Sequence, residues 1–302
     1  SRDNPMTART FTNNLWHMFF GTGLSNVLSD LGNQGEPPSH PKLLDWLAVE
    51  FMDSGWDMRH MVRLIVTSHA YRQSTTQPAD LREVDPYNRL VSVQSRRRIS
   101  AEMVRDNALK ISGLLNPKIG GPSVRPYQPA GYYAQLNFPK RTYQHSTDDD
   151  QYRRALYSHW QRTFLHPAMM AFDAPSREAC TAQRPVSNTP LQALTLMNDP
   201  SFVEAARYFG QRIMTEGGAT PDERIQWAFR EALSRPPNQN EAGILRGLYE
   251  KHREEFAAAP DEAKALLAVG LRSAETTEPA ELAAWTSVAR AILNLHELIT
   301  LL

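Results

Sequence analysis

Apolar residues recur at helical spacing along most of the chain. Leu43, Leu47 and Phe51 stand four residues apart, so they share one face of a helix that Gly55 is placed to end. The next apolar stripe begins at Met58, directly after Asp57, whose carboxylate can cap a helix start. The pattern therefore predicts helices packed through apolar faces.

Capping signals place most of the helix starts. Thr220-Pro221-Asp222-Glu223 reads as a capping box with proline in the first helical position. Other starts are predicted at these residues: Asn4-Pro5, Ser100, Thr189-Pro190, Asp199-Pro200, Asn238, Pro260 and Pro279. With roughly ten helices and no convincing βαβ unit, we expect an all-α fold. The residues expected in the core are Leu43, Leu47, Phe51, Val62, Ile65, Phe229, Leu248 and Trp285.

Residues 117–150 lack helical periodicity. They combine glycine and proline with Tyr127, Tyr132, Tyr133, Phe138 and Tyr143. This aromatic loop could stack on sugar rings or dock a partner, or it could pack its own rings onto the helices. We therefore divide the chain into an N-terminal helical part (1–116), an irregular connection (117–186) and a C-terminal helical part (187–302), all expected to form one integrated domain.

Composition excludes several classes of protein. The 33 basic and 33 acidic residues cancel, so no overall field recruits nucleic acid or an anionic membrane. No run of about 18 apolar residues predicts a membrane span. The opening residues lack an apolar signal core and an initiator Met, and we interpret the chain as a fragment of a longer protein.

The single cysteine, Cys180, cannot form an intrachain disulfide. Its basic surroundings could lower a thiol pKa, but free cysteines are usually buried, and we expect a structural residue under a loop. The helical stripes include His69, His252 and His296, which we interpret as hydrogen-bonded core residues. No histidine or cysteine spacing matches a metal or covalent haem motif, so neither a metal nor a cofactor is expected in this chain.

One run of arginines is a candidate anion site. The run Arg96-Arg97-Arg98 precedes the helix that contains Glu102 and Asp106. Guanidinium groups bind carboxylates, sulfates and phosphates, but the same run could be a structural ion-pair network in which one or two arginines pair with carboxylates. The candidate binding residues of the whole chain are Arg96, Arg97, Arg98, Arg177, Arg184, His40, Tyr132 and Tyr133.

Several longer motifs resemble one family over nearly the whole chain. The matching segments are NPMTAR at 4–9, QGEPPSHPKLLDWL at 34–47, SHAYRQS at 68–74, DPYNRL at 85–90 with RRR at 96–98, DAPSREAC at 173–180, SNTPLQAL at 187–194 and the closing Trp285, Leu293-Asn294 and Glu297. These segments are similar to the signature motifs of a family, the planctomycete domain of unknown function 1553. One departure is Leu298, where the family has phenylalanine.

The resemblance implies a context and no activity. Domains of this family are typically the C-terminal part of large exported proteins, after a cytochrome-c-like domain and a second uncharacterised domain. We therefore expect a periplasmic or extracellular, non-catalytic interaction module that docks on its neighbouring domains, with haem only in the upstream domain. The alternative is an enzyme or binding domain for anionic polysaccharide.

Overall fold

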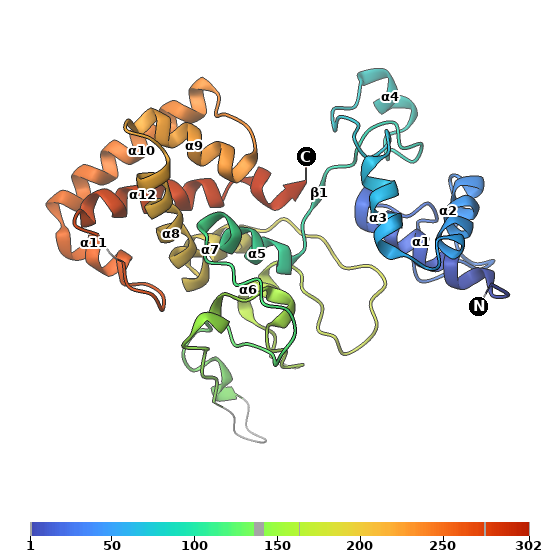
Figure 1. Cartoon of the computed structure of the whole chain (residues 1–302), viewed down its shortest axis with the longest axis horizontal. Coiled ribbons are helices and arrows are strands. Elements are labelled where there is room, and N and C mark those ends of the chain that lie inside the picture. Colours follow the sequence, from blue (N-terminus) through green and yellow to red (C-terminus); the bar gives the residue numbers. More distant parts are fainter. Residues whose placement is uncertain (1, 136–141, 163, 275, 302) are drawn as a thin grey trace. The chain divides into compact units, whose positions relative to one another are not determined.

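The computed structural model describes residues 2–135, 142–162, 164–274 and 276–301, and over these residues the chain is mostly helical (Figure 1). The α-helices are α1 (Pro5–Phe20), α2 (Pro41–Asp53), α3 (Met58–Thr67), α4 (Ala79–Val84), α5 (Ala101–Ser112), α6 (Pro167–Ala171), α7 (Pro190–Asn198), α8 (Pro200–Glu216), α9 (Pro221–Leu233), α10 (Gln239–Ala258), α11 (Pro260–Leu267) and α12 (Pro279–Leu293). Short 3-10 helices are η1 (Tyr132–Gln135), η2 (Asp149–Tyr152), η3 (Ala155–Tyr157) and η4 (His296–Ile299). The expected all-α fold is confirmed.

The chain divides into two compact units. Unit 1 consists of Ser1–Arg98, Thr181–Gln183 and Thr300–Leu302, and unit 2 consists of Ile99–Cys180 and Arg184–Ile299. The first boundary between the units lies after Arg98, whereas the sequence suggested a boundary after residue 116. Helix α5 belongs to unit 2 because its buried residues, among them Val104 and Leu109, pack in the same core as α8 and α12.

Unit 1 is built on α1, α2 and α3. Asn4 accepts a hydrogen bond from the Met6 amide at the start of α1, and Gly21 ends the helix in the left-handed conformation at φ 76°. Phe11 of α1 stacks on Phe51 of α2 with ring centroids 4.3 Å apart. The unit also contains two short antiparallel strands, β1 (Arg97–Arg98) and β2 (Thr300–Leu301).

In unit 2, α8 and α12 pack against each other along buried faces (Figure 1). Gly210 allows this close approach, because a Cβ atom there would lie 3.0 Å from the Thr286 amide nitrogen. Trp285 of α12 is fully buried and stacks on Tyr249 of α10 with centroids 4.4 Å apart. Both rings donate a hydrogen bond to Glu281, so this apolar layer also satisfies its polar atoms.

Buried arginines hold the irregular segment between α5 and α6. Arg105 of α5 donates to the carbonyl oxygens of Gln151 and Arg153. Arg153, also buried, donates to the carbonyl oxygens of Lys118, Gly120 and Pro122. A loop without a regular ladder must satisfy its carbonyl groups in another way, and here guanidinium groups do so.

The predicted helical phases hold for the large apolar residues. Leu47, Phe51, Ile65, Phe229 and Trp285 are buried, and none of the other three core predictions, Leu43, Val62 and Leu248, is fully exposed. The sequence pattern missed the short helices α4 and α6 and the strands β1 and β2.

The histidine interpretation is wrong at two of three positions. His69 is exposed because α3 ends at Thr67, so the apolar stripe does not extend to it. His296 is exposed on η4, where the chain leaves the helical phase of α12. His252 is half-buried beside Phe256.

Candidate functional site

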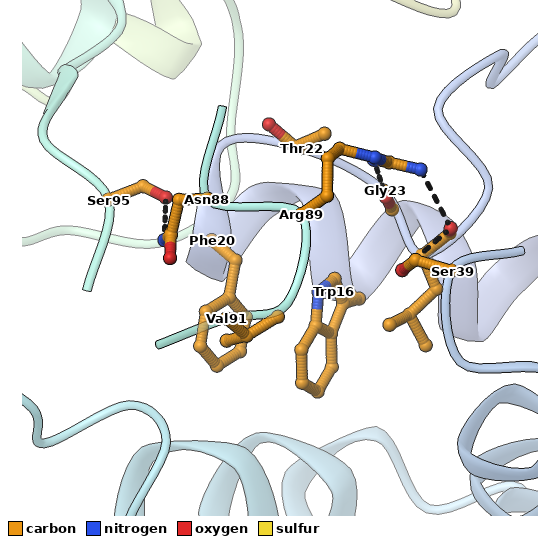
Figure 2. A pocket seen from close by; sticks show the side chains of 10 residues that line it. Trp16, Phe20, Thr22, Gly23, Ser39, Asn88, Arg89, Val91 and Ser95 are labelled. Carbon is orange, nitrogen blue, oxygen red and sulfur yellow. Dashed lines mark hydrogen bonds between the residues drawn. The ribbon is translucent and has the colours of Figure 1, made fainter. Parts of the chain in front are cut away.

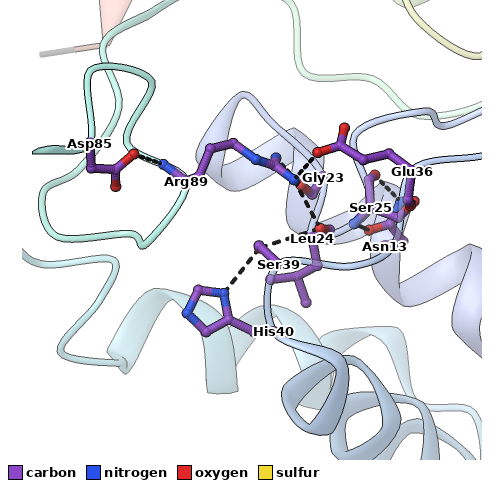
Figure 3. A network of polar contacts seen from close by, with 9 residues as sticks. All are labelled: Asn13, Gly23, Leu24, Ser25, Glu36, Ser39, His40, Asp85 and Arg89. Carbon is purple, nitrogen blue, oxygen red and sulfur yellow. Dashed lines mark hydrogen bonds and ion pairs between the residues drawn. The ribbon is translucent and has the colours of Figure 1, made fainter.

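The loop that joins α1 to α2 is held by side chains of its own unit. Asn13 of α1 accepts a hydrogen bond from the Ser25 amide and donates to the Ser25 carbonyl, both at 2.9 Å (Figure 3). The Ser25 hydroxyl donates to the carbonyl oxygen of Glu36 at 2.8 Å. The two ends of the loop are therefore fixed to each other and to α1.

Arg89 binds the same loop from another segment. Its guanidinium lies 3.2 Å from the Gly23 carbonyl, 3.4 Å from the Leu24 carbonyl and 3.2 Å from Oε1 of Glu36 (Figure 3). The buried carboxylate of Asp85 accepts from the backbone amides of Arg89 and Leu90. Asp85 thus orders the backbone that presents Arg89.

Backbone strain accompanies this arrangement. Asn88 and Val91 have φ of 50° and 56°, which is unusual for asparagine and an outlier for a β-branched residue. The Asn88 amide compensates by donating to the Val93 carbonyl and accepting from the Ser92 amide. Such strain persists only where neighbouring contacts fix it.

A small cavity lies beneath this turn, between Arg89, Trp16 and Phe20 (Figure 2). The two rings stack with centroids 4.0 Å apart. The volume of the cavity is about 10 Å³, which is enough for a single water molecule and too small for a substrate.

A larger pocket lies beside the α1–α2 loop. Its volume is about 240 Å³. The lining residues are Met6, Arg9, Ser25, Leu31, Gly32, Asn33, Gly35, Glu36, Pro37, Pro38 and Leu44. Two of these side chains are charged. Arg9 forms an ion pair with Asp45, and Glu36 forms an ion pair with Arg89.

Glycine is required at one point of this pocket wall. A Cβ atom on Gly35 would lie 2.0 Å from the Asp30 carbonyl oxygen. Any side chain would force the loop to move, so the glycine of the QGEPP motif is explained by close backbone approach.

The predicted site residues of unit 1 do not gather around either pocket. His40 contacts the Ser39 hydroxyl through Nδ1 at 3.0 Å. Arg96 is exposed, and Arg97 donates to the Phe19 carbonyl oxygen. We expected one or two of these arginines to pair with carboxylates, but the partner of Arg97 is a backbone carbonyl group. Burial, and then the positive charge of Arg97, lowers the pKa of His17.

The two arginines predicted as site residues in unit 2 contact different partners. Arg177 lies over the Trp160 ring at 4.0 Å, and Arg184 forms an ion pair with Glu102 at 2.8 Å. Burial acts to raise the pKa of Glu102, but hydrogen bonds from Arg184 and other groups outweigh it, so this pKa is lowered.

The described tyrosines of the aromatic loop turn inward. Tyr133 is buried, with its ring 5.3 Å from that of Tyr143, and half-buried Tyr132 donates to the Leu165 carbonyl. Tyr127 is buried as well. These rings pack on their own segment, and Phe138 lies outside the described residues.

The structure corrects the expectation that Cys180 is buried. The cysteine is exposed, not buried under a loop. The segment that contains it has no regular secondary structure, and its residues from Ser176 to Val186 are exposed. In this segment local sequence gives no periodicity from which burial could be inferred.

Sequence reasoning missed the two charged residues of the larger pocket, Arg9 and Glu36, and also Arg89, which pairs with Glu36. All three lie in motifs quoted above, so motif membership was the available signal, but the pairing of Glu36 with Arg89 depends on a contact across 53 residues. Among the described residues, no cluster of three or more His, Cys, Asp or Glu side chains is placed to hold a metal ion. Over the same residues, each helix is too short or too polar to cross a bilayer.

Comparison with known proteins gives one match. The profile of PSD1, protein of unknown function (DUF1553), matches residues 1–249. Neither a curated protein nor a solved structure matches the chain. The match covers most of the 302 residues, both the α1–α2 loop and the α7 motif, and the chain therefore belongs to the DUF1553 family.

Proposed function

We propose that this chain is a non-catalytic interaction module that docks on neighbouring domains of a longer protein. The observation that carries the proposal is the outward face of α7. Leu191 and Leu194 are 58% and 57% exposed on this helix, and Val186 just before it is 70% exposed. Large apolar side chains grouped on one segment are typical of binding surfaces.

The opposite side of α7 is fixed. Gln192 and Leu196 are buried, and the Gln192 amide donates to the Ser187 carbonyl. The Ser187 hydroxyl and amide in turn donate to the Asp173 carboxylate at 2.7–2.9 Å. A helix anchored in this way presents its two leucines without a further ordering cost.

The polar motif residues support a structural reading. Asp85, Asn88 and Arg89 bind backbone groups of their own unit, and Asp173 binds Ser187. These hydrogen bonds join groups of the fold to one another.

As part of the same proposal, the partner is a domain of an exported, planctomycete-type protein that contains a cytochrome-c-like domain. The haem then belongs to that domain, and the module works in the periplasm or outside the cell. This context rests on the family resemblance alone.

Binding between this chain and the cytochrome-c-like domain, measured by calorimetry, tests the proposal. The variant Leu191→Ser/Leu194→Ser should weaken binding at least about tenfold, since each covered leucine contributes roughly 1.5–3 kcal/mol. Ile244→Ser is the matched control, because Ile244 of α10 is 71% exposed. Equal effects of both variants, or no binding by the wild type, would contradict the proposal.

A second candidate is binding or processing of anionic polysaccharide. It is favoured by Arg177, an exposed guanidinium held over the half-buried Trp160 ring. Retention on a sulfated or uronic-acid glycan column, lost in Arg177→Met and in high salt, would support it. Retention that is unchanged in Arg177→Met would exclude this arginine as the glycan site.

A further inference from the structure

We infer that the pocket beside the α1–α2 loop binds a small zwitterion, an α-amino acid with an apolar side chain. This goes beyond the interaction surface on α7 and uses residues of unit 1 alone. The pocket volume of about 240 Å³ is below the roughly 300–1,000 Å³ of pockets for drug-sized ligands. A single amino acid or a single sugar ring is of suitable size.

Opposite charges line the pocket. Arg9 supplies a guanidinium, which has five N–H donors, and its described bond uses Nη2 for Asp45. Glu36 supplies a carboxylate, and its described side-chain bond uses Oε1 for Arg89. Within the described residues no bond to Oε2 of Glu36 is present. A ligand carboxylate is therefore suited to Arg9 and a ligand ammonium to Glu36.

The rest of the pocket wall favours an amino acid over a sugar acid as the ligand. Met6, Leu31 and Leu44 line the pocket together with two prolines. An apolar amino-acid side chain gains free energy by covering this surface, whereas a sugar acid would place hydroxyl groups against it. The combination of a cation, an anion and an apolar wall therefore favours the zwitterion.

The wall has a fixed shape. Ser25 is bound on both backbone groups by Asn13, and its hydroxyl holds the Glu36 carbonyl at 2.8 Å. Gly35 packs against the Asp30 carbonyl without room for a side chain. A preformed site loses less affinity to ordering on binding.

Calorimetry or NMR titration of the whole chain with L-leucine tests the inference. For nine non-hydrogen atoms we expect a Kd on the order of 0.1–10 mM. Leucinamide, which lacks the carboxylate, and 4-methylpentanoate, which lacks the ammonium group, should each bind at least about tenfold more weakly. Glucuronate should not compete.

Variants separate binding from folding. Arg9→Met and Glu36→Gln should each weaken leucine binding about tenfold or more. Asp45→Asn is the matched control for Arg9: it removes the same ion pair but leaves the guanidinium in the pocket, so binding should be unchanged or tighter. Helical circular dichroism must match the wild type in all three.

Three results would overturn the inference. The first is absence of saturable binding up to about ten times the weakest expected Kd. The second is tighter binding of glucuronate than of leucine, which would assign the pocket to sugar acids. The third is equal loss of binding in Asp45→Asn and Arg9→Met.

Discussion

The phenolic hydroxyl of Tyr152 donates a hydrogen bond to Oε1 of Glu204 at 2.8 Å, and the two residues are 52 positions apart in the sequence. Tyr127 donates to Oε2 of the same carboxylate at 2.9 Å, and the backbone amide of Arg272 donates to Oε1 at 2.9 Å. Glu204 and its neighbour Arg207 are both buried. The pKa of Tyr152 is raised, first by burial and then by this hydrogen bond, so the donor remains protonated.

Removal of that donor should destabilise unit 2. Tyr152→Phe leaves a buried carboxylate one hydrogen bond short, and we expect a loss of about 1–3 kcal/mol in the free energy of unfolding. Urea unfolding followed by circular dichroism measures it. Tyr87→Phe is the control, because Tyr87 is 83% exposed and should change stability little. Indistinguishable variants would show that Glu204 does not depend on Tyr152.

His166 should make the protein less stable in mild acid. It is buried, its Nε2 contacts the Tyr127 carbonyl at 2.7 Å, and its pKa is lowered to about 4 by burial and then by the charge of Arg105. The unfolded chain takes up the proton near pH 6.5, whereas the folded chain does so only near pH 4. Stability should therefore fall as pH decreases from about 6.5 to 4, by about 3 kcal/mol from this group.

His166→Gln tests this, because the glutamine amide can still donate to Tyr127 but cannot take up the proton. The unfolding free energy of the variant should depend less on pH between 6.5 and 4 than that of the wild type. His69→Gln, at an exposed histidine, should leave the wild-type slope unchanged. A wild-type slope in His166→Gln would show that other groups cause the acid sensitivity.

Two glycines should respond to alanine in opposite directions. Gly35→Ala places a Cβ atom 2.0 Å from a carbonyl oxygen, and we expect a loss of about 1–3 kcal/mol in stability. Gly247→Ala, in the interior of α10 with open space around the added carbon, should gain up to about 1 kcal/mol. Thermal unfolding of both variants measures the difference, and a neutral Gly35→Ala would contradict the described loop.

Cys180 should react readily with thiol reagents in the folded protein, because it is exposed. The labelling rate of the native chain should approach that of the urea-unfolded chain under the same conditions. A native rate lower by about a hundredfold or more would place the thiol in a protected environment.

Local sequence was sufficient to predict the longer helices, although it missed the short helices α4 and α6. Helix starts depend on contacts within four residues, such as the Thr220–Glu223 capping box and the Asp57 cap of α3, and these formed where the sequence placed them. Apolar spacing likewise gave the buried faces of Phe51 and Trp285. Such features are local, so local sequence is sufficient.

The burial of polar groups and the identity of their partners follow from the tertiary structure. Glu204 receives donors from Tyr127, Tyr152 and Arg272, and the pocket charge Glu36 pairs with Arg89 across 53 residues. It also placed Cys180 at the surface and turned Tyr133 inward. A buried polar group needs a partner, and the chain path that supplies one is not encoded in the spacing around the residue itself.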